Sequence, residues 1–208
     1  MAIATALSEL RPAEFIGELD ALLAIYASAM EADEALLPGR RELMRRHVEH
    51  PGFAALHVRA RTPQPAGDGW PVVAFAYGFH GEPGQWWYDA VRGALSRAVG
   101  GGRSAAWLGD CLEIAEVHVH SEYQRAGIGT SMLMALTSGR PERTALLSTP
   151  DRDTTARRLY RRLGFTDLLT GYSFPGGSPP YAVMGAPLPL RDTAPAAVRP
   201  RSASPSIS

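Results

Sequence analysis

The stretch "EVHVHSEYQRAGIGTSMLMAL", residues 116–136, decides how the fold can be interpreted. A pattern typical of a strand comes first, the glycines Gly127 and Gly129 follow, and an apolar helix pattern begins directly on them. The first backbone N–H groups of a helix have no internal partner, and the helix dipole favours an anion beside them. Glycine lets a phosphate approach the backbone, and Arg125 adds hydrogen-bond donors. The stretch therefore predicts either a pyrophosphate-binding turn or an ordinary glycine-rich turn between a strand and a helix.

The composition excludes several classes of protein. All 21 basic residues of the 208-residue chain are arginine, so no lysine is available for a Walker A loop or a pyridoxal-phosphate Schiff base. The formal net charge is +0, which gives no electrostatic footprint for nucleic-acid binding. No apolar run is long enough to span a membrane, and the first ten residues do not resemble a secretory signal. With Cys111 as the only cysteine, we expect a cytoplasmic protein without an internal disulfide, a nucleic-acid partner or a membrane partner.

Apolar periodicity predicts a mixture of helices and strands. Helices are expected at residues 15–26, 43–48, 129–138 and 154–163, with one more in an insertion at 81–110. Strands are expected at 53–60, 71–79, 112–119, 144–148, 165–174 and 181–188, the first two forming a hairpin. Because the elements do not alternate strictly, the fold class is α/β or α+β with a mixed sheet. We expect a single domain over residues 1–189 and a disordered tail at 190–208, which is rich in Pro, Ala, Ser and Arg.

Two motifs give the chain a resemblance to a known family. Residues 124–129, "QRAGIG", match the pattern Q/R-x-x-G-x-G/A, and residues 153–165, "DTTARRLYRRLGF", are similar to N-x-x-A-x-x-L-Y-x-x-x-G-F. In this order and spacing they resemble the motifs of the GCN5-related N-acetyltransferases, the GNAT family, and the resemblance extends over residues 112–188. It implies a strongly bent mixed sheet flanked by helices, and acetyl-CoA as the cosubstrate without a metal.

The resemblance also implies roles for individual residues. In this family the main chain of the strand before the turn pairs with the pantetheine arm, which points to Val117, His118 and Val119. The amides that hold the pyrophosphate would be those of Gln124, Arg125, Ala126, Gly127, Ile128 and Gly129. Tyr160 falls on the tyrosine that protonates the departing thiolate. Asp153 stands where the family usually has an asparagine that contacts the cofactor, so the resemblance makes it a candidate cofactor-binding residue, and we expect it to cap the helix that follows.

Transfer to an amine requires a base, because a lysine-like amine with a pKa of ~10.4 is protonated at neutral pH. Some members of the family carry a carboxylate at the end of the fifth strand, where this chain has Ser148. Glu116 is the first candidate for the base and Glu113 the second, although Glu116 could equally be a solvated or ion-paired strand residue. Strand alternation puts Glu116 on the opposite face from Val117, unless a bulge typical of the family changes the parity. The histidines nearby lack a third ligand for a metal.

The insertion contains an aromatic pair, Trp86 and Trp87. The pair could form a small core beneath a long loop, or a lid that excludes water from the acceptor. We expect an acetyl-CoA-dependent N-acetyltransferase that transfers an acetyl or other acyl group directly to a primary amine of a small molecule or peptide, as a monomer or homodimer. The alternatives are an acyl-CoA-binding regulatory module that has lost turnover and a generic interaction domain.

Overall fold

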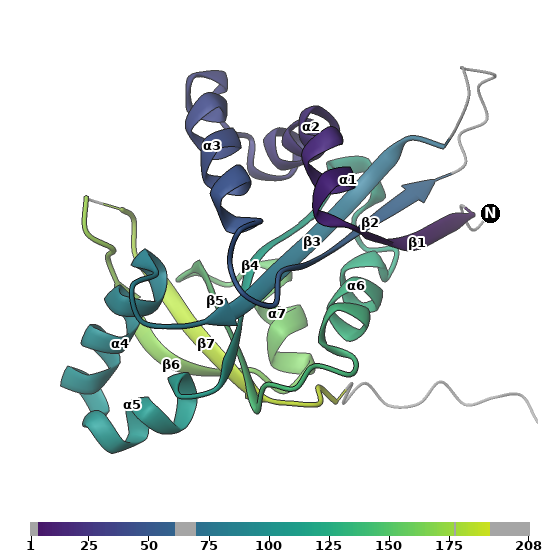
Figure 1. The fold of residues 1–208 in the computed structure, drawn as a ribbon. Coiled ribbons are helices and arrows are strands. Elements are labelled where there is room, and N and C mark those ends of the chain that lie inside the picture. The colour runs from purple at the N-terminus through teal and green to yellow at the C-terminus, as the bar shows by residue number, and fades with distance from the viewer. Residues whose placement is uncertain (1–3, 61–69, 177, 192–208) are drawn as a thin grey trace, which may run out of the picture.

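The computed structural model describes residues 4–60, 70–176 and 178–191. A seven-stranded sheet crosses the molecule in the order β1-β2-β3-β4-β5-β7-β6 (Figure 1). Neighbouring strands are antiparallel except β4 and β5, which are parallel. The mixed sheet predicted from the sequence is therefore confirmed. The turn expected between the first two predicted strands, and nearly all of the expected tail, lie outside the described residues.

The elements have the following bounds. The strands are β1 (Thr5–Leu10), β2 (Ala54–Ala60), β3 (Val72–Gly81), β4 (Cys111–Val119), β5 (Thr144–Pro150), β6 (Thr166–Tyr172) and β7 (Tyr181–Pro187). The α-helices are α1 (Pro12–Gly17), α2 (Leu19–Met30), α3 (Leu37–His47), α4 (Trp86–Val99), α5 (Gly101–Leu108), α6 (Ile128–Thr137) and α7 (Thr155–Arg162). Short 3₁₀ helices occupy Glu34–Leu36 and Ser121–Tyr123. Among the described residues, no helix is long and apolar enough to cross a membrane.

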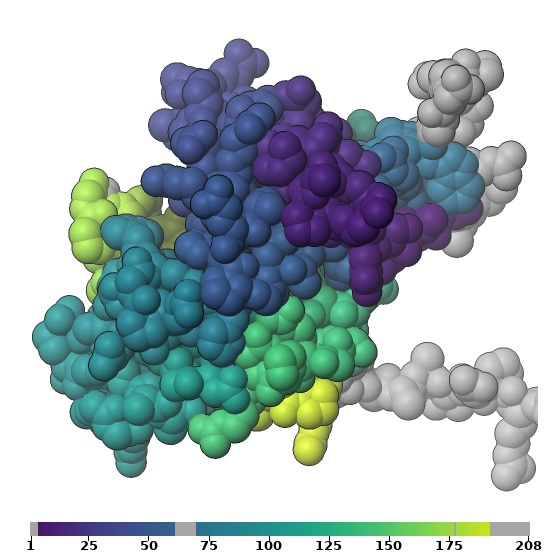
Figure 2. Space-filling view, viewed as in Figure 1, coloured from purple at the N-terminus to yellow at the C-terminus, as the bar shows by residue number. Residues whose placement is uncertain are grey.

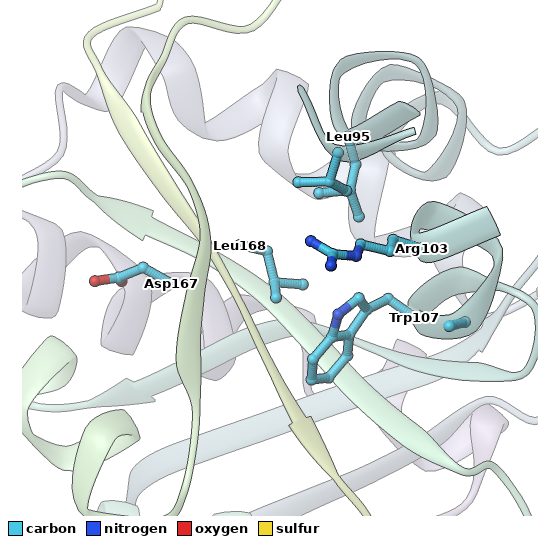
Figure 3. Close-up of a pocket in the computed structure, with 7 residues that line it drawn as sticks. Leu95, Arg103, Trp107, Asp167 and Leu168 are labelled. Atoms are coloured by element: carbon cyan, nitrogen blue, oxygen red, sulfur yellow. The ribbon is translucent and has the colours of Figure 1, made fainter. Parts of the chain in front are cut away.

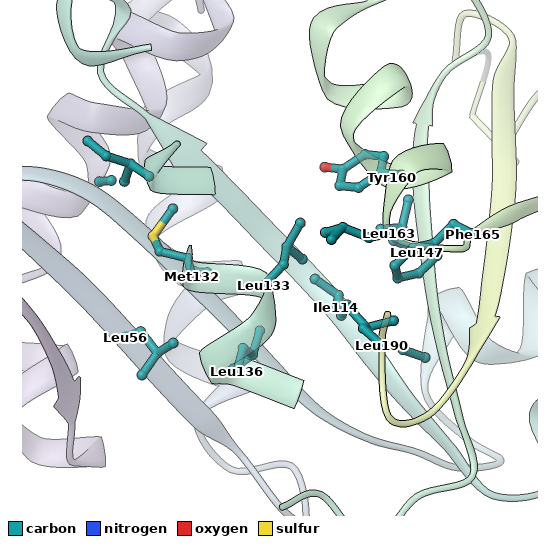
Figure 4. Packing of buried hydrophobic residues seen from close by; sticks show 14 of the residues in the cluster. Leu56, Ile114, Met132, Leu133, Leu136, Leu147, Tyr160, Leu163, Phe165 and Leu190 are labelled. Atoms are coloured by element: carbon teal, nitrogen blue, oxygen red, sulfur yellow. The ribbon is translucent and has the colours of Figure 1, made fainter. Parts of the chain in front are cut away.

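Helices cover both faces of the sheet. On one face, α6 and α7 pack on the central strands, and Figure 4 shows Leu133 of α6 and Leu163, which directly follows α7, converging on Ile114 of β4. On the other face, α1, α2 and α3 pack over β3 around Phe15 and Tyr77, while α4 and α5 cover β5 and β7. Both faces are therefore apolar, which explains why the central strands read as nearly continuous hydrophobic runs.

Strand β4 has two irregularities that shape the centre of the sheet. Its pairing with β3 passes from Tyr77 opposite Glu116 to Gly78 opposite Ile114, so Ala115 is an extra residue and forms a β-bulge. Its pairing with β5 extends only to Glu113 opposite Leu146. Beyond that pair the two parallel strands separate, and each has an edge whose main-chain groups are not used in the ladder between them. This separation opens the sheet at its centre.

Three local features differ from the sequence predictions. Strand β1 was not predicted, because five of its six residues are exposed and it offers no apolar run. The first predicted helix is two helices, since the chain bends at Glu18 (φ −96°, ψ 3°). The insertion contains α4 and α5 rather than one helix, because Gly100 adopts φ 84° and ends α4, and the glycine run then begins α5.

Candidate active site

Tyr160 lies beside the separation between β4 and β5. Thr154 caps helix α7, because its hydroxyl accepts a hydrogen bond from the Arg157 amide at 3.0 Å, and the chain leaves the helix through Gly164 at φ 92°. Tyr160 packs against Phe165 with its ring buried, and Figure 4 shows its hydroxyl directed toward the β4 side. Burial, and secondarily the charge of Glu116, raises the pKa of Tyr160 to about 12. Its hydroxyl therefore stays protonated at neutral pH and can act as a donor.

The prediction that Asp153 caps α7 is wrong. Thr154 provides the cap, because its hydroxyl is in reach of the free amide of the first turn. The carboxylate of Asp153 instead accepts a hydrogen bond from the Arg158 guanidinium at 2.7 Å, and both side chains are exposed. Asp153 is therefore held to the outer surface of α7.

The glycine turn precedes α6, with Arg125 at φ 65° and Gly127 at φ 82°. A Cβ added at Gly127 would meet nothing within 4 Å, so the glycine is needed for the left-handed backbone and leaves open space beside it. A Cβ at Gly129 would lie 3.1 Å from Leu159 Cδ2, so this glycine lets α6 approach α7. The two glycines thus have different structural roles, and only Gly127 borders open space where an anion could sit.

Glu116 lies on the opposite face of β4 from Val117, as strand alternation predicted, and the bulge at Ala115 falls before it. Its Oε1 accepts a hydrogen bond from Arg40 Nη1 at 2.6 Å, and its Oε2 accepts one from His118 Nε2. Burial by itself would raise the pKa of Glu116, but His118 and then Arg40 outweigh it, and the pKa lies below its ordinary value. Glu116 is therefore an ion-paired carboxylate with both oxygens in use.

Glu113 differs from Glu116 in its surroundings. It is the last β4 residue that pairs with β5, and it is only 5% exposed. Its Oε2 is buried and has no hydrogen-bond partner among the described residues. Burial raises the pKa of Glu113 to about 8. A carboxyl group at the point where the strands separate, with a pKa close to neutral, is suited to proton transfer.

The sequence did not predict the helix residues that contact Glu116. Arg40 on α3 reaches Glu116, and its guanidinium also donates to the Tyr26 hydroxyl at 3.1 Å while lying 4.7 Å from the centre of the Tyr26 ring. His47 hydrogen-bonds the Tyr77 hydroxyl at 3.0 Å nearby. Nothing in the sequence distinguishes Arg40 from the other arginines of α3, because its partner is 76 residues away.

The structure gives different environments to the two tryptophans of the insertion. Trp87 packs against the core beneath α4, and its Nε1 donates to Ser148 Oγ at 3.1 Å. Trp86 is 61% exposed, and its ring contacts Phe174 with 5.5 Å between centroids. The small-core interpretation is thus confirmed for Trp87 and is wrong for Trp86.

A surface cavity of about 370 Å³ lies elsewhere, between α4, α5 and β6. Figure 3 shows Arg103 reaching into it between Leu95 and Trp107, with Leu168 opposite. None of the residues implicated in acetyl transfer lines this cavity. The described residues also contain no group of three or more side chains that could hold a metal ion.

The geometry defines a class of protein. An opened parallel strand pair, a glycine turn with free helix amides beside it, a buried tyrosine donor and two buried carboxylates suit an enzyme that binds a nucleotide-linked acyl thioester and transfers its acyl group. The open edge of β4 offers main-chain partners to an extended arm, and Gly127 leaves room for a phosphate. The residues present therefore fit acetyl-CoA.

Comparisons with known proteins agree with this class. Residues 84–167 match the family model of an acetyltransferase (GNAT) domain. The GCN5-like protein acetyltransferase Rv2170 of Mycobacterium tuberculosis is 34% identical over 203 residues, which cover 88% of this chain and 98% of that protein. The chain belongs to the GNAT family and is an acetyltransferase.

Solved structures share the fold. The structure of Arabidopsis thaliana NAA60 in complex with acetyl-CoA superposes with a TM-score of 0.61 at 18% identity, over 89% of this chain and 99% of that one. The ribosomal-protein alanine N-acetyltransferase of Escherichia coli superposes with a TM-score of 0.56 at 17% identity, over 88% of this chain and 94% of that one. The GNAT fold predicted from the two motifs is therefore confirmed.

Proposed function

We propose that the protein transfers the acetyl group of acetyl-CoA directly to a primary amine of a protein or peptide. The observation that carries this proposal is the separation of β4 and β5, with the Tyr160 donor on one side and the carboxyl groups of Glu113 and Glu116 on the opposite face. A polypeptide acceptor is favoured over a small molecule because the relative with 34% identity is named a protein acetyltransferase.

The cosubstrate would lie along the free edge of β4 and across the glycine turn. The main chain of residues 117–119 would pair with the pantetheine arm, and the amides of residues 124–129 would bind the pyrophosphate. Gly127 supports the second role through the open space beside it. Asp153 has less support as a contact, because its carboxylate is paired with Arg158 on the outer surface.

Acetyl-CoA supplies an acetyl group activated as a thioester. The amine nitrogen forms a bond to the acetyl carbon, the carbon–sulfur bond breaks, and the amine loses a proton. Tyr160 hydrogen-bonds the departing sulfur and gives it a proton, which the high pKa of the hydroxyl keeps available at neutral pH. Such general-acid assistance is typically worth about 10²–10⁴ in rate.

Glu113 is the better proton acceptor of the two carboxyl groups. Both oxygens of Glu116 accept charged or histidine donors, and its lowered pKa makes it a weak base. Glu113 has a free buried oxygen and a pKa of about 8, so it holds a proton more strongly once it has received one. We infer that Glu113 accepts the amine proton, directly or through water, while Glu116 holds Arg40 and His118 in place. Glu116 remains the second candidate for the base.

The pH dependence of turnover separates these roles. Acetylation of a peptide amine should be measured for the wild type, Glu113→Gln and Glu116→Gln between about pH 6 and pH 10. If Glu113 is the base, kcat/KM of the wild type rises through an inflection near 8, and Glu113→Gln lowers the rate by about 10²-fold and removes that inflection. A wild type without an inflection near 8, together with a large rate loss in Glu116→Gln but not in Glu113→Gln, would assign the base to Glu116. Acetyl-CoA binding without product from any amine would contradict the proposed function.

A further inference from the structure

The acceptor side of the active site can be located from the carboxyl groups. Paired residues of neighbouring strands lie on the same face of a sheet, so Glu113 shares its face with Phe79 of β3 and Leu146 of β5. Helix α4 packs on this same face, where Leu146 belongs to the core beneath it. The amine must meet the base, so the acceptor approaches on the face that α4 partly covers.

Five aromatic side chains form a wall on this face: Trp86, Trp87, Tyr172, Phe174 and Tyr181. The Phe174 ring contacts those of Trp86, Tyr172 and Tyr181, with centroids 5.5, 4.8 and 5.6 Å apart. Trp87 donates to Ser148, which lies two residues beyond Leu146, or about 7 Å along the strand. The wall therefore stands beside the free edge of β5, close to where the amine and the thioester have to meet.

The start of α4 is fixed to its surroundings by several hydrogen bonds. Gln85 is buried, its Nε2 donates to the His80 carbonyl at 2.9 Å, and its Oε1 accepts from the Glu82 amide at 3.1 Å. The Tyr172 hydroxyl donates to the Ala90 carbonyl at 3.3 Å and connects β6 to the helix. Residues held in this way present a preformed surface, which suits selection among acceptors.

The outer part of the wall is open. Trp86 is a large apolar side chain left 61% exposed next to Phe174, and Figure 2 shows the yellow-green loop between β6 and β7 beside the teal surface of α4. An open surface accommodates a long polypeptide, whereas a small amine would need an enclosed pocket. Aromatic side chains contribute binding energy by contact with apolar groups.

We propose that Trp86 and Trp87 determine acceptor specificity by selecting a polypeptide with an apolar side chain next to the acetylated amine. This inference rests on the proposed function, because it concerns the acceptor of that reaction. The amine enters between the wall and the carboxyl groups, and the adjacent apolar side chain packs against Trp86 and Phe174. The five side chains of the wall are uncharged, so an arginine or lysine next to the acetylated amine would form no ion pair with them.

The test uses equal-length peptides with one free amine that differ only in the adjacent residue, which is leucine, glycine or arginine. For the wild type, kcat/KM for the leucine peptide should exceed that for the glycine peptide by at least about 10-fold, and the arginine peptide should be no better than glycine. Trp86→Ala should reduce the leucine preference to less than about 3-fold by raising KM for the leucine peptide, with KM for acetyl-CoA unchanged. Trp87→Phe, which keeps an aromatic side chain but removes the N–H that donates to Ser148, should retain most of the preference.

Trp70→Ala is the matched control, because Trp70 is also exposed and precedes the opposite end of β3. It should leave the leucine preference intact. A wild type without preference, a preference for arginine, or an unchanged preference in folded Trp86→Ala would each overturn the inference while leaving the proposed function standing. Absence of acetylated product from all peptides would overturn the proposed function and this inference together.

Discussion

A carboxyl group that is buried without a partner costs stability when it ionises, and Glu113 is such a group. Its oxygen Oε2 has no hydrogen-bond donor among the described residues, whereas Glu116, three residues along the same strand, is matched by Arg40 and His118. Functional groups are often kept in unfavourable surroundings, because the surroundings tune their pKa. The contrast between these two carboxyl groups is the main argument for different roles in catalysis.

This contrast predicts a pH-dependent stability difference. Burial raises the pKa of Glu113 from its ordinary value of 4.5 to about 8, so the protonated carboxyl group stabilises the folded state. This contribution to the free energy of unfolding is fully present below about pH 4.5 and is lost as the pH rises through about 8. At about pH 9, the free energy of unfolding of Glu113→Gln should therefore exceed that of the wild type by on the order of 4 kcal/mol. At about pH 4 the two free energies should differ little. Urea denaturation at both pH values checks this. A gain of equal size at both would show that Glu113 does not titrate as proposed.

Tyr160 gives a second prediction at this scale. Tyr160→Phe keeps the ring that packs on Phe165 and removes only the hydroxyl. We expect kcat to fall by about 10²-fold or more, with the affinity for acetyl-CoA and the thermal stability nearly unchanged. Steady-state kinetics together with calorimetric titration separate these quantities. A variant with wild-type kcat would reduce Tyr160 to a packing residue.

At the scale of elements, the turn before α6 separates two uses of glycine. Gly127 supplies a left-handed backbone next to open space, while Gly129 makes room for Leu159 of the neighbouring helix. Gly139, at the end of α6, has the same kind of backbone as Gly127, with φ 66° and nothing within 4 Å of an added Cβ. It therefore provides a control with similar backbone strain at a position away from the turn.

We expect Gly127→Ala and Gly139→Ala to lose similar amounts of stability, about 1 kcal/mol each, because both place a Cβ on a left-handed residue. Only Gly127→Ala should weaken acetyl-CoA binding, by at least about 10-fold, because its methyl group occupies the space proposed for the phosphate. Calorimetry on both folded variants makes the comparison. Equal affinities in the two variants would remove the turn from the cosubstrate site.

The elements that sequence reasoning predicted correctly are those built from neighbouring residues. The turn at 124–129 and helix α7 are each formed by neighbouring residues, and the two sequence motifs predict them. Strand β1 was not predicted because it is an exposed edge strand that pairs with β2 through its backbone and lacks an apolar pattern. The cap of α7 was misplaced by one residue, because Asp153 and Thr154 are both good caps and only the geometry decides between them.

At the scale of the whole molecule, the active site depends on contacts that no local pattern records. Arg40 on α3 pairs with Glu116 on β4, and Trp87 on α4 donates to Ser148 on β5. The bulge at Ala115 is defined by register with β3, which the sequence of β4 alone does not specify. The sequence therefore predicts the cosubstrate side of the site, which lies in two short motifs, better than the acceptor side, which residues from separate elements form.

The central claim is that acetyl-CoA and a polypeptide amine react where β4 and β5 separate. The most direct measurement is mass spectrometry of a peptide with one free amine, incubated with acetyl-CoA and the protein, with the released CoA quantified in the same sample. The account predicts one acetyl group on the amine for each CoA released. It also predicts a rate about 10²-fold lower with Tyr160→Phe, and a lower affinity for acetyl-CoA in Gly127→Ala than in Gly139→Ala. Release of CoA without acetylated peptide would contradict this claim, and so would an acetylation rate that is unchanged in both Tyr160→Phe and Gly127→Ala.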